Sequence, residues 1–355
     1  MAFINRKTTK NILKLITTQV IIITVVICYI VFYYEKPLNI SVSEYNKTLN
    51  LSKNHNLSIK WNNHPRGVIV TLIGSTNTSV VRVINMIHSV IQFHSVQENF
   101  HYPFLIFHDQ GLTLSKRQYI LSCTNYTNKQ INILFILLDY QTNAQISPNS
   151  TQRPSIGYRL MCRFWSYDVF YHPAIRNQQY DYLMRMDDDS YFLDKTKLDL
   201  FEYIHQQKLD YVYRSLYTDT CKALFSIEKQ FTNRTVARTD CIYNNFFLIR
   251  LNWFYQSEKI QRFLNELIRD DLMIREYIGD GCVHAAMIDI EKNTRIRKFM
   301  RIPYGHNYHI MLRNREGIYN HVNEFFPQMG MSCHQLTIID SYKKNFKKIQ
   351  ISLQK

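Results

Sequence analysis

Short apolar runs, each bounded by polar residues, recur along the chain from residue 66 onward. Runs of this length with few charges are typical of strands that are buried on both faces of a sheet. The segments that predict strands are RGVIVTLIG (66–74), YPFLIFHD (102–109), INILFILLD (131–139), the run over 182–186 and NNFFLIR (244–250).

Helical patterns lie between these runs. Apolar residues recur at helical spacing over 80–91, and further helices are predicted over 155–172 and 253–268. Strands that alternate with helices predict an α/β fold with a mixed, mostly parallel sheet and helices on both faces. Ligands bind such sheets beyond the carboxyl ends of the strands, so polar residues that directly follow a strand are the first candidates for a site.

Residues 15–34 form an uncharged and mostly apolar stretch, LITTQVIIITVVICYIVFYY. This is about the length of helix that crosses the hydrocarbon core of a bilayer, roughly 20 residues. No small-residue cleavage site follows, which argues against a removed signal peptide. Basic residues precede the stretch and Glu35 follows it, so the N-terminus is expected in the cytosol. The sequence therefore predicts a single-pass type II membrane protein.

The rest of the chain then faces the secretory lumen. The predicted organisation is a cytoplasmic tail over 1–14, a signal-anchor over 15–34, a lumenal stem over 35–65, one large domain over 66–340 and a basic tail over 341–355. Acceptor sites for N-glycosylation occur at Asn39, Asn46, Asn50, Asn56, Asn77, Asn125, Asn149 and Asn233. The cysteines beyond the membrane are Cys123, Cys162, Cys221, Cys241, Cys282 and Cys333. Their even number permits up to three disulfides, and the sequence leaves the pairing open.

The formal net charge is +15. A basic lumenal protein can steer anionic nucleotide sugars toward a cleft, although a solvated basic surface explains the charge equally well. The lumenal compartment excludes nucleic acid as a partner. Glycine is scarce, and neither a GxGxxG loop nor a Walker loop occurs, which argues against dinucleotide and P-loop binding.

Three adjacent carboxylates, Asp187, Asp188 and Asp189, directly follow the predicted strand over 182–186. Adjacent carboxylates repel one another, so a cluster at the end of a strand is typically neutralised by a cation. Asp-x-Asp after a strand is the arrangement with which many nucleotide-sugar glycosyltransferases hold Mn²⁺ or Mg²⁺. The alternative is a solvated acidic turn without a ligand.

Four stretches resemble the fungal Golgi α-1,2-mannosyltransferases, glycosyltransferase family 15. They are FHYPFLIFHDQGLT (100–113), GYRLMCRFWSYDVFYHPAI (157–175), YDYLMRMDDDSYFLD (180–194) and IGDGCVHAAMI (278–288). The resemblance implies a GT-A-like, nucleotide-sugar-binding fold and a catalytic domain in the Golgi lumen. It also implies Mn²⁺ as cofactor, GDP-mannose as donor, a mannose-containing glycan as acceptor, and retention of the α configuration.

The resemblance also assigns metal ligands. Asp187 and Asp189 take the positions of the family's acidic ligands, and His306 in IPYGHNYH (302–309) takes the position of its histidine. Oxygen and imidazole ligands together favour Mn²⁺ over Mg²⁺. His309 lies three residues further on and is the alternative imidazole.

Further site residues follow from the same blocks. Tyr158 matches a family tyrosine near the nucleotide. Arg159, Arg163 and Arg185 are candidates for the donor phosphates, with salt bridges to the acidic turn as their alternative role. Asp280 matches an active-site aspartate and is expected to act as acid/base or to bind the acceptor hydroxyl; the alternative is a helix cap.

The chain departs from the family at CIYNNFFLI (241–249), where Phe247 or Leu248 stands at the position of the family's candidate nucleophile, a glutamate. Neither side chain can form a glycosyl ester, so front-face retention is the easier mechanism, and Asn245 or its neighbour Asn244 is expected to stabilise the oxocarbenium-like centre. Gly74-Ser75 also replaces an Arg-Asn pair near the donor. These departures leave two alternatives open: a transferase for galactose or N-acetylglucosamine, and a lumenal sugar-binding pseudoenzyme.

Overall fold

The computed structural model describes residue 61, residues 64–94, 101–124, 131–139, 142–148, 150, 155–299 and 302–312, and the backbone of 315–318. These residues all belong to the unit that starts at Trp61. No helix in this part of the chain is long and apolar enough to cross a membrane. The predicted anchor over 15–34 and the basic tail over 341–355 lie outside the described residues and remain predictions.

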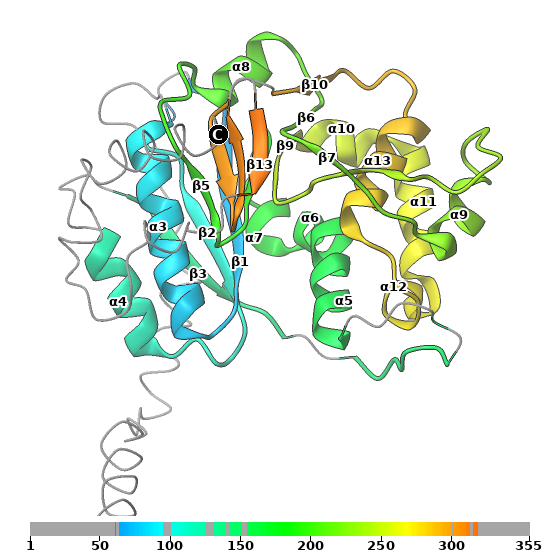
Figure 1. Cartoon of the computed structure of the whole chain (residues 1–355), viewed down its shortest axis with the longest axis horizontal. Coiled ribbons are helices and arrows are strands. Elements are labelled where there is room, and N and C mark those ends of the chain that lie inside the picture. Colours follow the sequence, from blue (N-terminus) through cyan, green and yellow to red (C-terminus); the bar gives the residue numbers. More distant parts are fainter. Residues whose placement is uncertain are drawn as a thin grey trace, which may run out of the picture. The chain divides into compact units, whose positions relative to one another are not determined.

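A central sheet of seven strands organises the described residues (Figure 1). Its spatial order is β10 (Ile296–Lys298), β6 (Tyr211–Tyr213), β9 (Phe246–Arg250), β4 (Tyr182–Met186), β1 (Gly67–Ile73), β2 (Phe104–His108) and β3 (Ile133–Leu137). Four of the six pairings are parallel, and β9 runs antiparallel to both β4 and β6. The predicted mixed, mostly parallel sheet is therefore confirmed.

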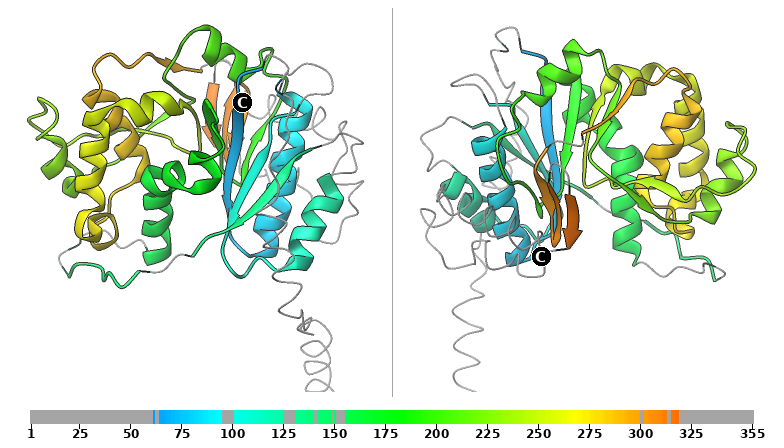
Figure 2. Two further views of the ribbon diagram at one scale, coloured as in Figure 1. Left: turned by 180° about the vertical axis from the view of Figure 1, so that it is seen from behind. Right: turned by 45° about the horizontal axis from the view of Figure 1, so that its top comes forward.

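Helices cover both faces of this sheet, as the views in Figures 1 and 2 show. Side chains alternate along β1, so Val68 and Val70 pack on one face while Ile69 and Ile73 pack on the other. The Ile69 face is covered by α3 (Asn77–Phe93), α4 (Leu114–Thr124) and α8 (Leu200–Gln206). The Val68 face is covered by α5 (Ile156–Arg163), the π-helical turn over Phe164–Asp168, α6 (Val169–Tyr171), α7 (Pro173–Arg176), α9 (Lys222–Glu228), α10 (Leu251–Gln256), α11 (Glu258–Ile268), α12 (Leu272–Arg275) and α13 (Asp280–Ile290).

A second, antiparallel sheet contains β5 (Ser190–Phe192), β11 (Tyr304–His306), β12 (His309–Leu312) and β13 (Arg315–Ile318). It was not predicted, because its strands are only three or four residues long. Such short runs carry little periodicity. β5 begins directly after the three aspartates, so this sheet brings a distant part of the chain to the end of β4.

The helix predicted over 253–268 is divided in two. Ser257 has extended backbone angles, and its hydroxyl accepts the N–H of Ile260, which caps α11. A serine hydroxyl satisfies an otherwise unpaired N–H at a helix start, so α10 and α11 are separate helices. The helix predicted over 155–172 is present, with a π-helical turn inside it.

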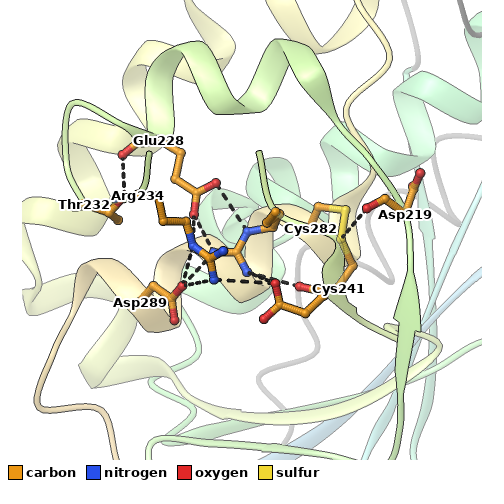
Figure 3. Close-up of polar contacts among 9 residues, drawn as sticks. Asp219, Glu228, Thr232, Arg234, Cys241, Cys282 and Asp289 are labelled. Carbon is orange, nitrogen blue, oxygen red and sulfur yellow. Dashed lines mark hydrogen bonds and ion pairs between the residues drawn. A yellow bond between two sulfur atoms is a disulfide. The ribbon is translucent and has the colours of Figure 1, made fainter. Parts of the chain in front are cut away.

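A disulfide fastens the start of α13, and an ion network around the buried Glu228 fastens its end. Cys241 lies on β8 (Asp240–Ile242), which pairs with β7 (Leu216–Thr218), and it is bonded to Cys282 on α13. Arg238 contacts Glu228 at 2.5 Å and Asp289 at 2.9 Å, and the Glu228 side chain is fully buried. Figure 3 shows Glu228 and Asp289 on either side of Arg234, with the disulfide beside them. Of the other three cysteines in the described range, Cys123 is disulfide-bonded, whereas Cys162 and Cys221 are free and buried.

Candidate metal and sugar-transfer site

The three aspartates form a tight turn at the carboxyl end of β4. The Asp187 N–H donates to the carbonyl of Asn245 at 3.2 Å, and the Ser190 N–H donates to the carbonyl of Asp187 at 3.0 Å. β4 is buried along its whole length, so the chain has to leave the core at this point. The turn therefore holds carboxylates at the edge of the sheet where ligands of α/β proteins bind.

His306 reaches the turn through strand pairing. In the register of β11 with β5, His306 is opposite Ser190, the residue that follows Asp189. His306 Nε2 lies 3.0 Å from Asp189 Oδ1 and 3.8 Å from Asp187 Oδ2. Its other nitrogen, Nδ1, is hydrogen-bonded to the Tyr243 hydroxyl at 2.8 Å. The imidazole is thus oriented from both sides, with Nε2 toward the carboxylates.

The electrostatics of the cluster are those of a site that attracts a cation. Burial lowers the pKa of His306, but the hydrogen bond and charge of Asp189 outweigh it and the net shift is upward. Burial raises the pKa of Asp187 above its usual value even though Arg185 opposes it. Burial and the two neighbouring aspartates together raise the pKa of Asp188 to about 7. Bringing three carboxylates together is costly, and a divalent ion would relieve the repulsion.

The donor set fits Mn²⁺. One ligand atom from each of Asp187, Asp189 and His306 lies within 4.8 Å of the others. Two carboxylates and one imidazole, with other positions left for a diphosphate, suit a metal of intermediate hardness such as Mn²⁺. His309 does not belong to this group; its ring packs edge-to-face against that of Tyr243, with 5.5 Å between the ring centres.

Arg185 connects the metal cluster to Asp280. Its side chain is almost fully buried, and Nε and Nη2 bond the Asp187 carboxylate at 2.7 and 3.2 Å. Nη1 bonds Asp280, and the guanidinium carbon lies 4.1 Å from the centre of the Trp165 ring. A planar guanidinium can bridge two carboxylates and stack on an indole at once, which an ammonium group cannot do. Arg185 therefore acts within the protein, in the alternative role stated above, rather than pointing freely at a donor phosphate.

A chain of hydrogen bonds continues from Asp280 into the core. Asn244 Nδ2 donates to Asp280 Oδ2 at 3.1 Å, and the Tyr211 hydroxyl donates to Asn244 Oδ1 at 3.1 Å. Tyr211 also contacts His284 Nδ1 at 2.8 Å. Burial raises the pKa of Asp280, but the charge and hydrogen bond of Arg185 outweigh it and the net shift is downward. Asp280 is accordingly held as a carboxylate.

Tyr158 lies at the surface near Asp280. Its side chain is 44% exposed, and its ring lies 6.3 Å from that of Tyr277. Burial of the hydroxyl and the nearby charges, Asp280 among them, raise the pKa of Tyr158. The phenol therefore stays protonated at neutral pH and can donate a hydrogen bond to a substrate.

The side chains of Arg159 and Arg163 bind other parts of the protein. Arg159 is fully buried, and its Nη1 donates to the carbonyls of Ile274 and Arg275 at 3.1 and 3.0 Å. Arg163 Nε bonds Asp168 at 3.0 Å. Both guanidinium groups are engaged in contacts within the fold, and their expected role at the donor phosphates stays a prediction.

The side chains of Asn245 and Asn244 have different hydrogen-bond partners. Asn245 Oδ1 accepts the hydroxyl of Tyr304 at 3.0 Å, and the Asn245 carbonyl holds the aspartate turn. Asn244, rather than Asn245, contacts Asp280. Phe247 and Leu248 are completely buried on opposite faces of the sheet. Asn244 is thus the neighbour of Asp280, the catalytic role expected of Asn245 stays a prediction, and the side chains at 247 and 248 lie in the core.

Gly74 and Ser75 follow β1, which is the parallel neighbour of β4. They accordingly lie at the same edge of the sheet as the aspartates. Lys116 Nζ donates to the Ser75 carbonyl at 2.6 Å, which places a cation beside the expected donor loop.

Sequence reasoning missed Tyr243 and Tyr211. Both are ordinary aromatic residues of short segments, and their roles depend on partners 63 and 73 residues away along the chain.

No protein-family model matches this sequence, and no curated protein sequence matches it. Solved structures do. Core-mannan synthase A (CmsA/Ktr4) from Aspergillus fumigatus, in an Mn/GDP form, superposes with a TM-score of 0.58 at 17% identity over 71% of this chain and 77% of that chain. The mannosyltransferase Ktr4p from S. cerevisiae in complex with GDP gives 0.55 at 17% identity over 70% and 72%.

A second structure of Ktr4p from S. cerevisiae gives a TM-score of 0.56 at 17% identity over 81% of each chain. These comparisons define the class of fold: a GT-A-like mixed α/β fold of the kind found in these fungal mannosyltransferases. The family resemblance noted in the sequence is thereby confirmed at the level of the fold.

Proposed function

We propose that this chain is a metal-dependent, retaining glycosyltransferase that moves mannose from GDP-mannose, in α-1,2 linkage, to a mannose-terminated glycan on glycoprotein. The observation that carries the proposal is the convergence of Asp187, Asp189 and His306 at the end of β4. The fold is shared with an enzyme whose structure is an Mn/GDP form, and the sequence motifs agree with that family.

Asp187, Asp189 and His306 would hold the ion, and Mn²⁺ when bound supplies positive charge that stabilises the departing diphosphate. Arg185 keeps the Asp187 carboxylate in place through two hydrogen bonds. Tyr243 keeps His306 Nε2 directed at the ligand position. These residues form a preorganised polar environment, so little reorganisation is needed during the reaction.

Asp280 is the residue that we assign to the acceptor. Arg185 and Asn244 both bond its Oδ2, which leaves Oδ1 to accept a substrate hydroxyl. The resemblance aligns Phe247 or Leu248 with the family's nucleophile, and both are hydrocarbon side chains buried in the core. Retention would then follow a front-face route, in which the acceptor hydroxyl approaches on the side of the departing diphosphate. Asn244, fixed by Tyr211, is placed to stabilise positive charge at the sugar.

The same absence of a nucleophile favours a second candidate, a lumenal sugar-binding pseudoenzyme. In that case glycan binding would persist while metal and nucleotide binding would be weak. The Gly74-Ser75 loop leaves a third, in which the fold and metal are retained and the donor carries galactose or N-acetylglucosamine.

For its location we propose the Golgi membrane, with a type II anchor and the catalytic domain in the lumen. The apolar stretch over 15–34 and the glycosylation sites support this. The Cys241–Cys282 disulfide also supports it, because disulfides persist in oxidising compartments.

The test is a donor screen with the lumenal domain from Trp61 onward, with Mn²⁺ and with chelator. A matched control is Asp194→Asn, which changes an exposed carboxylate outside the cluster. Mn²⁺-dependent turnover of GDP-mannose, lost in Asp187→Ala/Asp189→Ala but kept in Asp194→Asn, is the expected result. Turnover of another nucleotide sugar, without turnover of GDP-mannose, would keep the proposed chemistry and change the donor. No turnover by the folded domain with mannoside acceptors present would favour the pseudoenzyme.

A further inference from the structure

Four tyrosines line the site on the side of Asp280. We call Tyr243, Tyr217, Tyr277 and Tyr158 the tyrosine wall. The ring of Tyr243, which touches the metal ligand His306, lies 6.0 Å from that of Tyr217. At the other end, the Tyr277 ring lies 6.3 Å from the exposed ring of Tyr158. The wall therefore extends from the metal cluster to the protein surface.

Oxygen atoms converge beside this wall at Gly279, the residue that precedes α13. A Cβ atom placed on Gly279 would lie 3.3 Å from the Tyr277 hydroxyl, 3.4 Å from the Tyr217 hydroxyl and 3.4 Å from Asp219 Oδ2. Tyr277 donates a hydrogen bond to Asp219 at 3.2 Å. Glycine thus lets two phenols and a carboxylate come close together next to Asp280.

The strand that carries Asp219 into this position is well anchored. Asp219 follows β7, which pairs with β8, and β8 is joined to α13 by the disulfide. Figure 3 shows Asp219 beside the Cys241–Cys282 disulfide, with its backbone carbonyl 4.0 Å from Cys241 Sγ. Side chains held on strands and helices in this way are suited to binding, since they lose little freedom when a ligand arrives.

The two phenols and the Asp219 carboxylate favour a neutral, hydroxyl-rich ligand. Burial and the neighbouring carboxylates raise the pKa of Tyr217 and of Tyr277, so both phenols remain hydrogen-bond donors at neutral pH. Asp219 and Asp280 would repel a phosphate, which excludes the diphosphate of the donor. Aromatic faces with a few convergent polar groups are typical of sites for small polar organic ligands.

We propose that the tyrosine wall and Asp219 form the subsite for the acceptor sugar, a neutral pyranoside, and direct one of its hydroxyl groups to Asp280. The assignment rests on the proposed glycosyltransferase function and names the substrate-binding half of that site. Asp219, Tyr217 and Tyr277 are specificity residues in it, while the metal and diphosphate occupy the side of His306.

The test compares Asp219→Asn and Tyr277→Phe with Tyr203→Phe, a control on α8 at the opposite face of the sheet. Initial rates are measured against methyl α-D-mannopyranoside as acceptor, and GDP–Mn²⁺ binding is measured by calorimetry. A hydrogen bond to a charged group contributes enough that its loss raises the acceptor KM about tenfold or more. The expected result is that rise in both site variants, with GDP–Mn²⁺ affinity unchanged and Tyr203→Phe like the wild type. An unchanged acceptor KM in both variants overturns the proposal.

Sugar binding is also measured without catalysis, by saturation-transfer NMR with Mg²⁺ and GDP and with mannoside, galactoside and N-acetylglucosaminide methyl glycosides. This measurement tests sugar binding at the subsite independently of sugar transfer. A domain that turns over no donor but binds a glycoside, and loses the signal in Asp219→Asn and Tyr217→Phe, supports the subsite while refuting the proposed function. A wild-type domain that binds none of the glycosides, or site variants that bind as well as the wild type, refutes the subsite.

Discussion

The Tyr243 hydroxyl is hydrogen-bonded to Nδ1 of His306 at 2.8 Å, while Nε2 of the same ring faces Asp189 at 3.0 Å. If Nε2 binds an ion, as we propose, the ring would carry its proton on Nδ1 and donate it to the Tyr243 oxygen. Such partners typically orient the ring and raise its basicity. The phenol can accept this proton, so its position is compatible with the tautomer that a metal site requires.

Replacing Tyr243 by Phe keeps the ring contacts and removes this hydrogen bond. We expect Mn²⁺ to bind about tenfold more weakly in the presence of GDP, since loss of such a partner typically costs 10- to 100-fold (roughly) in affinity. Calorimetry or EPR titration measures this directly. Tyr255→Phe, which removes the hydrogen bond to the Phe170 carbonyl in the helical layer, is the control. Equal affinity of Tyr243→Phe and the wild type would refute the role.

Arg185→Gln is expected to destabilise the fold strongly. It leaves the buried Asp187 and Asp280 without their shared cation, and breaking such a pair costs about 3–5 kcal/mol. The double variant Arg185→Gln/Asp280→Asn should lose less unfolding free energy than the sum of the losses in the two single variants, because each single change already removes the same interaction. Urea unfolding of the wild type, Arg185→Gln, Asp280→Asn and the double variant measures this coupling.

The control for this cycle is the ion pair between Arg66 and Asp181, whose side chains are 41% and 39% exposed. Arg66→Gln should cost no more than about 1 kcal/mol, as is typical of surface pairs. If the two arginine variants lost equal stability, Arg185 would not be the buried bridge that the contacts indicate.

His88 is expected to make the fold sensitive to mild acid. Burial lowers the pKa of His88 to about 4, although its hydrogen bond to the Cys123 carbonyl opposes this. In the unfolded chain a histidine titrates near pH ~6.5. Between these values the unfolded state binds a proton that the folded state does not, so stability falls as the pH is lowered. The loss from pH 7 to pH 5 should be about 2 kcal/mol.

His88→Gln keeps an amide that can donate to the same carbonyl and has no titrating ring. Urea unfolding at pH 7 and pH 5 should therefore show a smaller loss in the variant than in the wild type, while all other titrating groups cancel. Identical losses in the two proteins would mean that His88 is protonated in the folded state.

The Cys241–Cys282 disulfide spans 41 residues and ties β8 to the start of α13. Replacing both cysteines by serine is expected to lower the free energy of unfolding by about 2–4 kcal/mol. Because Asp280 lies at the start of α13, the acceptor KM should rise more than the KM for the donor. A variant with the stability of the wild type would show that the ion network of Glu228 and Arg238 suffices to hold this segment.

Local patterns in the sequence were enough to predict most of the central sheet. β1, β2, β3, β4 and β9 each lie within an apolar run that was expected to be a strand. Burial on both faces requires such runs in β1, β2, β4 and β9, whereas β3, at the edge of the sheet, is only partly buried. The aspartate turn follows from the same pattern, since its ligands are neighbours along the chain. The motifs of the family then identified His306 and Asp280 as candidates.

Tertiary structure alone decided how these residues combine. Arg159, Arg163 and Arg185 stand in equally suggestive blocks, but only Arg185 is packed between Asp187 and Asp280, the second of which is 95 residues away. The pairing of β11 with β5, two strands too short to predict, determines that His306 meets Asp189. The convergence of Asp219, Tyr217 and Tyr277 at Gly279 likewise depends on packing. Sequence patterns report local burial, whereas a binding site depends on distances between segments that only the packed core establishes.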